Sequence, residues 1–169
     1  GTMDRETGQG EPTAYYSYGA LGMEVAVNVE TGDIKMLKAL GYYDAGRILN
    51  IGTIAGQMDG AFSMGIGQAI FEETLSNSQG KVINPNYRDY KIPTMLDIPF
   101  NDQMSGGFVG EPNEEGPYGA KGIGEVALVP VMPAIANAIN AAVGIELNEI
   151  PMTKERILNG IKAKQAVRV

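Results

Sequence analysis

The sequence predicts an α+β fold in which a mixed sheet containing a β-hairpin packs in layers against helices. Residues 24–30 alternate apolar and polar side chains, and turn residues separate them from a second extended run. Two later stretches place apolar residues three and four positions apart, which is the spacing of a helix face. A strand pair followed by separate helices favours α+β layers over βαβ units. Because no repeat, low-complexity tract or linker interrupts the chain, residues 1–169 are expected to form a single unit.

The hairpin is expected to begin with a strand over residues 24–30, whose valines point to one face and whose polar residues point to the other. Thr31-Gly32-Asp33 supplies the turn, and residues 34–43 continue as an extended, apolar-rich run. Such alternation is typical of a strand that is buried on one side only.

A helix is expected from about Thr53 to Ser76, and it carries an unusual face. Gly52, Gly56 and Gly60 lie four residues apart, and each glycine inside a helix costs about 1 kcal/mol relative to alanine. A helix that accepts this cost usually has something close to its backbone. Tight packing against the sheet is the simpler explanation, and a cofactor lying across that face is the alternative.

Three prolines favour loops and short strands over residues 81–100. Beyond the glycine-rich stretch 106–125, a second helix is expected with Pro133 in its first turn and Gly144 just after its end. Thr153 is expected to cap a short terminal helix. The inward-facing residues of these two helices are predicted to be Ile135, Ala138, Ile139, Ala142 and Val143, followed by Ile157, Leu158 and Ile161.

The composition excludes several kinds of chemistry from this chain. It has no Cys and no His, which excludes disulfides, the usual zinc sites, cysteine-ligated iron–sulfur clusters and Ser-His-Asp or Cys-His nucleophiles. The formal net charge is -7 and the basic residues are scattered, so no nucleic-acid surface is expected. Any catalysis must use carboxylates, amides, hydroxyls, Lys, Arg, backbone groups or a borrowed cofactor.

The start of the chain predicts no signal peptide, because its first twelve residues are polar and glycine-rich, and this favours a cytoplasmic location. Residues 1–3 are interpreted as a remnant of cloning. Residues 126–145 carry no charge, but Pro130, Pro133 and two asparagines favour a buried helix over a membrane span.

The stretch 116–125 is the candidate site, and three interpretations of it are open. Its end formally fits the G-x-G-x-x-A dinucleotide pattern, but no apolar strand precedes it and two prolines interrupt the helix that this pattern needs. A structural loop with Glu125 near a helix N-terminus is the default. Alternatively, the glycines let the backbone approach a ligand and deliver Glu125 as a general base, provided that it is buried and that a cofactor supplies the redox chemistry.

A series of motifs carries a family resemblance from about Asp4 onward. The most specific motif is Gly116-Pro117-Tyr118-Gly119-Ala120-Lys121-Gly122-Ile123-Gly124-Glu125. Further motifs lie at residues 7–10, 44–50, 56–61, 65–69, 89–94, 133–139 and 151–153. In this order and spacing, they resemble the C-terminal part of the molybdopterin-binding subunit of the xanthine dehydrogenase and aldehyde oxidase family. The resemblance implies the layered molybdenum-cofactor-binding domain of that family.

The resemblance implies roles for individual residues. Glu125 matches the family's catalytic glutamate, and Gln57 matches a glutamine that contacts the molybdopterin cofactor. For Gln57 a satisfied core amide is the alternative. Gly56 would allow close approach of the cofactor or a neighbouring domain, whereas Gly122 and Gly124 would bend the chain so that Glu125 faces the metal. No residue of this chain is expected to ligate a metal.

The implied activity is hydroxylation of an electron-poor carbon in an N-heterocycle or aldehyde, with oxygen from water and Glu125 as general base. The implied cofactor is molybdopterin, with its cytosine dinucleotide form left open, and electrons would leave through iron–sulfur clusters to FAD or another acceptor. The implied partners are the remainder of the molybdenum subunit, an iron–sulfur subunit, an FAD subunit and a small-molecule substrate. Because family subunits are several times longer, this chain is expected to fold but to bind no cofactor and to be inactive by itself.

Two departures and two alternatives accompany this interpretation. Ile51 and Val126 stand where the family often has proline, although neither position carries a proposed reacting group. A non-catalytic scaffold or assembly domain of the same fold is the main alternative, and retention of Glu125 and Gln57 favours the enzyme. A stand-alone nucleotide or phosphate binder would instead show affinity for ATP or NAD. The residues present do not predict which substrate is used.

Overall fold

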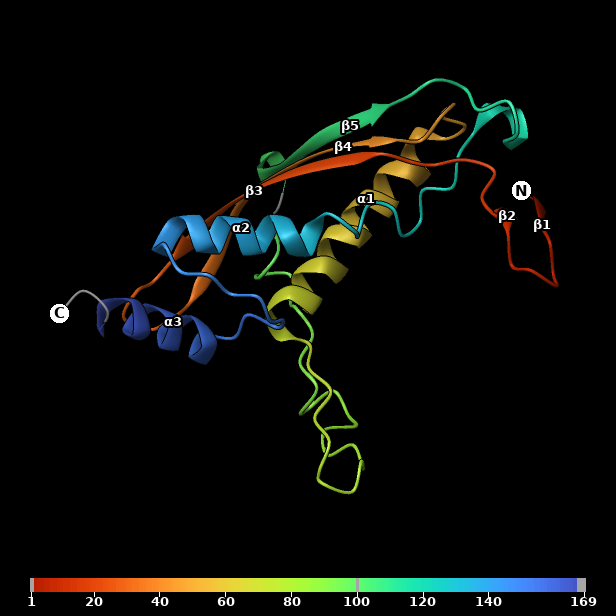
Figure 1. The fold of residues 1–169 in the computed structure, drawn as a ribbon. Coiled ribbons are helices and arrows are strands. Elements are labelled where there is room, and N and C mark those ends of the chain that lie inside the picture. The colour runs from red at the N-terminus through yellow and green to blue at the C-terminus, as the bar shows by residue number, and fades with distance from the viewer. Residues whose placement is uncertain (1, 100, 167–169) are drawn as a thin grey trace.

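The computed structural model describes residues 2–99 and 101–166, and it has the expected α+β layers (Figure 1). The helices lie on one face of the sheet, and a long loop after the first helix projects away from the layers (Figure 1). The strands are β1 (Thr2–Met3), β2 (Gly10–Glu11), β3 (Gly19–Val27), β4 (Ile34–Asp44) and β5 (Met104–Val109). The helices are α1 (Ile51–Ile66), α2 (Val131–Val143) and α3 (Lys154–Ala166), with short helical turns η1 (Gly67–Phe71), η2 (Asn101–Gln103) and η3 (Pro117–Gly119).

The predicted hairpin is confirmed, and it belongs to a mixed sheet of order β3-β4-β5. β3 and β4 are antiparallel, whereas β5 runs parallel to β4. The first strand extends from Gly19 to Val27, so the prediction of residues 24–30 was wrong at both ends. The strand stops early because the Asn28 side chain accepts hydrogen bonds from the backbone N–H groups of Glu30 and Thr31, which fold the chain into the turn.

Strand β5 was not predicted, because its residues show no alternation of apolar and polar side chains. It lies in the glycine-rich stretch, and Gly106 pairs with Gly41 of β4. Gly106 has φ +149°, and a Cβ at this position would overlap the backbone of Gly41. The two backbones therefore approach closely enough that glycine is required.

Helix α1 begins earlier and ends earlier than predicted. Asn50 caps it, because its side chain accepts a hydrogen bond from the Thr53 N–H at 3.0 Å. After η1 the chain becomes extended at Glu72 rather than continuing to Ser76. The reason lies in Asn84, a buried amide that donates to the Glu73 carbonyl and accepts from the backbone N–H of Leu75. These backbone groups therefore find partners outside a helix.

The two C-terminal helices form as predicted. Gly144 follows α2 with φ +64°, and Thr153 accepts a hydrogen bond from the backbone N–H of Arg156 at the start of α3. The prediction is wrong for one residue of the apolar stripe, because Ala142 is exposed. The residues of these helices that are buried are Val131, Ile135, Ile139, Ile157 and Ile161.

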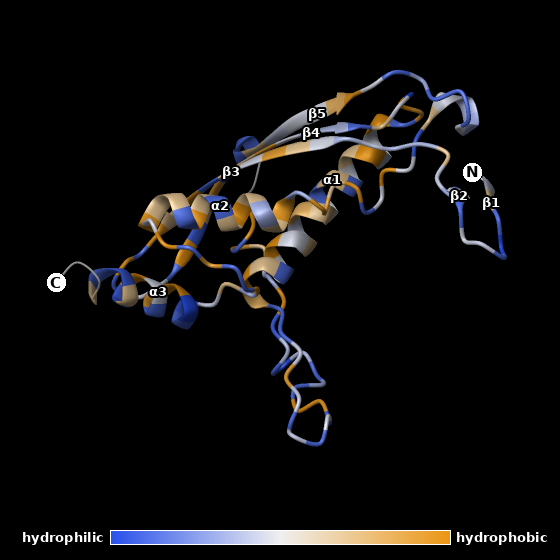
Figure 2. Cartoon of the chain, viewed as in Figure 1, coloured by the Kyte–Doolittle hydropathy of each residue, from blue (hydrophilic) through white to orange (hydrophobic). Residues whose placement is uncertain are grey.

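The core lies between the sheet and the helices. Tyr43 of β4, Phe62 of α1 and Ile135 of α2 are fully buried in one continuous cluster. Gly65 lets α1 approach α2, because a Cβ there would overlap the Val131 side chain. Figure 2 shows hydrophobic residues on α2 and along the strands, and hydrophilic residues on α3. In the described ranges, no helix combines the length and apolar character needed to cross a membrane.

Candidate active site

Two elements that are distant in the sequence meet at a small cavity of about 130 Å³. One wall comes from α1 and the other from the turn that follows Gly122 and Ile123. The cavity therefore brings together four of the predicted site residues, whereas Gly122 does not line it. Its lining consists of Gly56, Gln57, Gly60, Ala61, Met64, Gly124, Glu125 and Leu128.

The glycine face of α1 is open. Among the described residues, a Cβ added to Gly56 or Gly60 would meet no atom within 4 Å, and both residues are exposed. In the same part of the chain, a Cβ at Gly52 would contact only the Asn50 side chain. The expectation that this face packs tightly against the sheet is therefore wrong. The close packing contact of α1 is instead at Gly65, where a Cβ would overlap Val131 of α2.

Gln57 projects from the same open face. Gln57 is exposed, and its side-chain amide forms no hydrogen bond with any other residue in the ranges 2–99 and 101–166. The alternative interpretation as a satisfied core amide is therefore wrong. A Cβ at Gly124 would lie 4.0 Å from Gln57 Oε1, so the amide reaches directly across to the turn that carries Glu125.

Glu125 lies in a turn and not at a helix terminus. Its backbone carbonyl accepts from the Leu128 N–H at 3.0 Å, and α2 begins only at Val131. The part of the default interpretation that placed Glu125 near a helix N-terminus is therefore wrong, because that electrostatic effect fades beyond the first turn. The side chain is exposed, so the described residues do not provide the burial expected for a carboxylate base.

The dinucleotide interpretation also fails in the structure. The residues before Gly122 form η3 and a loop with a single bridge, Gly46 to Ala120, rather than a strand. The residues after Gly124 form turns as far as Pro130. The strand and helix N-terminus that would bind a pyrophosphate are both missing from this segment.

An ion pair that the sequence did not reveal anchors Lys121, at the start of the turn that carries Glu125. Lys121 Nζ lies 2.5 Å from Asp44 Oδ2 and also donates to the Tyr16 carbonyl at 2.9 Å. Asp44 Oδ1 accepts from the Gly46 N–H at 3.0 Å. Gly110, with φ +117°, passes so close that a Cβ there would overlap this carboxylate. Both charged side chains are nearly buried, with 13% and 11% of their surfaces exposed.

The pKa of Asp44 is lowered by this arrangement. Burial alone would raise the pKa, but the hydrogen bond and charge of Lys121 and the Gly46 N–H outweigh it and hold the pKa below the ordinary value of 3.8. A carboxyl group with a depressed folded-state pKa contributes stability above its unfolded pKa, and that stability is lost as the pH falls through the folded pKa.

Asp44→Asn should lower the free energy of unfolding at neutral pH by about 3 kcal/mol, because it leaves the Lys121 charge buried without its partner. It should also flatten the loss of stability on acidification below the unfolded pKa. Urea unfolding between pH 7 and pH 3 measures both effects. Asp33→Asn, which removes an exposed partner of Lys154, is the matched control. Parallel pH profiles for the wild type and Asp44→Asn would contradict this assignment.

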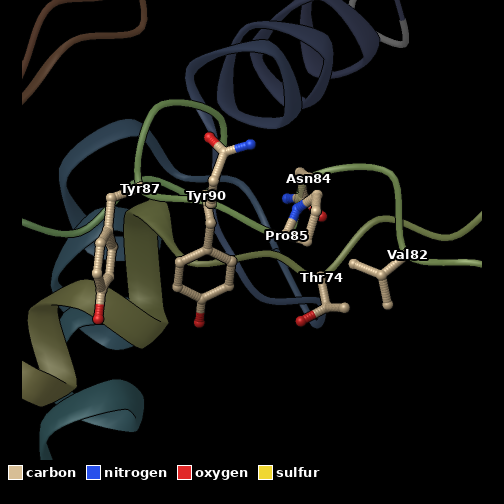
Figure 3. A pocket seen from close by; sticks show the side chains of 7 residues that line it. Thr74, Val82, Asn84, Pro85, Tyr87 and Tyr90 are labelled. Atoms are coloured by element: carbon tan, nitrogen blue, oxygen red, sulfur yellow. The ribbon is translucent and has the colours of Figure 1, made fainter.

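A larger cavity of about 570 Å³ lies on the projecting loop after α1 (Figure 3). The rings of Tyr87 and Tyr90 lie along one side of it (Figure 3). The Tyr90 hydroxyl donates to Glu72, and both ends of the buried Asn84 amide have partners. Because none of the predicted site residues lines it, we place the candidate site at the smaller cavity. Within the described residues, no group of three carboxylates is arranged to hold a metal.

A family model and several curated proteins match this chain. A family model described as a molybdopterin cofactor-binding domain matches residues 2–99. The xanthine dehydrogenase molybdenum-binding subunit of Escherichia coli O157:H7 is 36% identical over 142 residues, which cover 83% of this chain and 18% of that protein. Subunit gamma of the 6-hydroxypseudooxynicotine dehydrogenase complex of Paenarthrobacter nicotinovorans is 34% identical over 148 residues, which cover 85% of this chain and 18% of that protein.

The fold also matches solved structures. The aldehyde oxidoreductase from Desulfovibrio gigas superposes with a TM-score of 0.82 and 31% sequence identity, over 92% of this chain and 16% of that chain. The chain thus spans about a fifth of the length of the curated relatives that it matches.

Proposed function

The chain belongs to the family of molybdopterin cofactor-binding domains, and on that premise we propose that it forms part of the active site of a molybdenum hydroxylase. In this proposal residues 1–169 are the C-terminal portion of the molybdopterin-binding domain. Gln57 contacts the cofactor, and Glu125 is the general base. The observation that carries the proposal is the shared cavity, at which the α1 glycine face, Gln57 and Glu125 meet.

The donors and the free space at this cavity suit a molybdopterin cofactor. The Gln57 amide offers both a donor and an acceptor, and within the described part of the chain neither has a partner. The open backbone beside Gly56 and Gly60 admits a flat group in contact with the helix. Gly56, Gln57 and Gly60 would therefore hold one side of the cofactor, and the backbone around Gly124 would face it from the turn.

When bound, the cofactor would supply the redox chemistry, because it would take up the substrate hydrogen together with the two electrons of the C–H bond that a C–OH bond replaces. The chain's own contribution is the proton transfer. Glu125 accepts the proton of the water-derived hydroxyl group as that oxygen attacks the substrate carbon. Gly122 and Gly124 place no side chain at their own positions in the turn, so the carboxylate can face the reacting atoms. The remainder of the subunit would exclude water by covering the exposed carboxylate.

The substrate class in this proposal is an N-heterocycle or an aldehyde, since relatives are named for xanthine, 6-hydroxypseudooxynicotine and aldehyde. The remainder of the molybdenum subunit, an iron–sulfur subunit and an FAD subunit are the proposed partners. Relatives that are subunits of dehydrogenase complexes support this assembly. Inactivity of the isolated chain and a cytoplasmic location stay predictions.

The cofactor-binding part of the proposal is tested by filling the glycine face. Gly56→Ala combined with Gly60→Ala should stabilise the isolated chain by about 1–2 kcal/mol, because alanine favours a helix and both positions have free space. The same pair should lower the molybdenum content of the complete subunit, because the added methyl groups occupy the cofactor's place. Thermal unfolding and metal analysis give the two readouts.

Gly52→Ala is the matched control, because Gly52 is exposed on the same helix but does not line the cavity. It should leave the molybdenum content unchanged. If the double variant stabilises the chain and the complete subunit still retains its full molybdenum content, then the cofactor does not lie against this face.

A further inference from the structure

Two neighbouring residues at the end of β4 bind the chain on both sides of Glu125. The Tyr43 hydroxyl donates a hydrogen bond to the carbonyl of Ala127 at 3.1 Å. The Asp44 carboxylate accepts from Lys121 Nζ at 2.5 Å. Lys121 and Ala127 lie on either side of residues 122–126, the turn segment that carries Glu125, so the end of one strand binds this segment at its beginning and at its end.

The hydrogen bond between Tyr43 and Ala127 is deeply buried. Tyr43 and Ala127 both have 0% of their surfaces exposed. Burial raises the pKa of Tyr43 to about 12, so its hydroxyl keeps its proton at neutral pH and remains a donor. A hydrogen bond in these surroundings has no competing water, so its loss leaves a carbonyl without a partner.

Further hydrogen bonds reinforce the other end of the turn. The Lys121 N–H donates to the carbonyl of Ala45 at 3.0 Å, and the Gly122 N–H donates to the Tyr15 hydroxyl at 2.8 Å. Both partners lie outside the turn, in segments more than 70 residues earlier. The start of the turn is therefore fixed to the body of the domain by backbone and side-chain contacts together.

The middle of the turn has few such contacts. Gly122, Gly124 and Glu125 are exposed, and the Glu125 side chain has no hydrogen-bond partner within residues 2–99 and 101–166. Glycines give the backbone many accessible conformations, so this segment has little intrinsic preference for one position of the carboxylate. Ile123 and Val126 pack against the core on either side of Gly124 and Glu125, and the hydrogen bonds at the two ends fix the backbone further.

We propose that Tyr43, Asp44 and Lys121 form a clamp that positions Glu125 for catalysis by holding both ends of its turn. The clamp residues do not contact the reacting atoms, so they are positioning residues. This inference rests on the proposed role of Glu125 as general base. Proton transfer requires the base within hydrogen-bond reach of its proton, and a displacement of about 1 Å can lower a rate roughly a hundredfold.

The test uses Tyr43→Phe and Lys121→Met in the complete molybdenum enzyme. Tyr43→Phe keeps the buried ring and removes only the hydroxyl, whereas Lys121→Met removes the cation but keeps an apolar stem. Each should lower kcat by roughly tenfold to a hundredfold, with KM and molybdenum content close to the wild-type values. Lys121→Arg should restore much of the rate, because it keeps the charge that Asp44 binds.

The matched controls make the same chemical changes elsewhere. Tyr90→Phe removes a hydroxyl that donates to Glu72 on the projecting loop, and Lys154→Met removes the exposed partner of Asp33. Both should leave kcat unchanged. As a readout independent of turnover, amide hydrogen exchange at residues 122–126 should become faster in the clamp variants, while exchange in the core of α2 stays slow.

The outcomes separate the clamp from the role of Glu125 itself. If Glu125→Gln abolishes turnover but the clamp variants keep the wild-type kcat, then the clamp inference is overturned and the proposed function stands. If exchange at residues 122–126 is unchanged in the clamp variants, then the clamp is also overturned, whatever the rates. If Glu125→Gln keeps the wild-type rate, then both proposals fail.

Discussion

Glu125→Gln in the complete molybdenum enzyme should lower kcat by roughly a hundredfold to ten-thousandfold, the range that general-base catalysis contributes. The amide has nearly the shape of the carboxylate but cannot accept a proton. Because Glu125 is exposed and makes no side-chain hydrogen bond within the described residues, its replacement should not disturb the fold. Steady-state kinetics and molybdenum analysis of the same preparation measure rate and cofactor content together.

Glu115→Gln provides the control for this substitution. Glu115 is also an exposed glutamate in the preceding loop, but it does not line the cavity. It should leave the rate unchanged. Near-normal turnover of Glu125→Gln with full molybdenum content would contradict the proposed base and leave the family membership as a statement about fold and cofactor.

Phe62→Ala should lower the free energy of unfolding by about 3–5 kcal/mol, which is the usual effect of removing a large aromatic side chain from a core. Phe62 is fully buried on α1, in the cluster that also contains Tyr43 and Ile135. A cavity at this position loosens α1 against the sheet. Urea denaturation of the chain, with the midpoint and slope fitted separately, measures the change.

Leu96→Ala is the corresponding control, because Leu96 is a large apolar residue with 95% of its surface exposed. Its removal should change the free energy of unfolding by less than about 0.5 kcal/mol. A loss at Phe62 no larger than the loss at Leu96 would show that α1 is not held by this core. Because Gln57 projects from α1, Phe62→Ala is also expected to lower cofactor retention in the complete subunit.

The exposure of Gln57 and Glu125 indicates that the described residues form only one side of the proposed site. Within the described residues, both side chains face an open cavity and neither has a hydrogen-bond partner. A carboxylate base and a cofactor-binding amide normally work in a site from which water is excluded. In the proposed function, the missing walls come from the remainder of a subunit about five times as long.

The sequence by itself determined the layered α+β class, the hairpin and both C-terminal helices. These features depend on local signals, such as the cap at Thr153, the glycine at position 144 and alternation along β3. The order of its motifs also predicted the family, and the family model that matches residues 2–99 confirms this prediction. Local chemistry sufficed because each signal acts over a few neighbouring residues.

Only the tertiary structure decided which glycines of α1 are open and which are packed. Gly60 and Gly65 look alike in sequence, yet Gly60 has free space while Gly65 contacts Val131 of α2. Strand β5 escaped prediction for the same reason, since its place depends on pairing with β4. The ion pair of Asp44 and Lys121 joins residues that are distant in the sequence, so no local pattern could reveal it. Contacts of this kind depend on how separate elements pack, and the chain specifies that packing only as a whole.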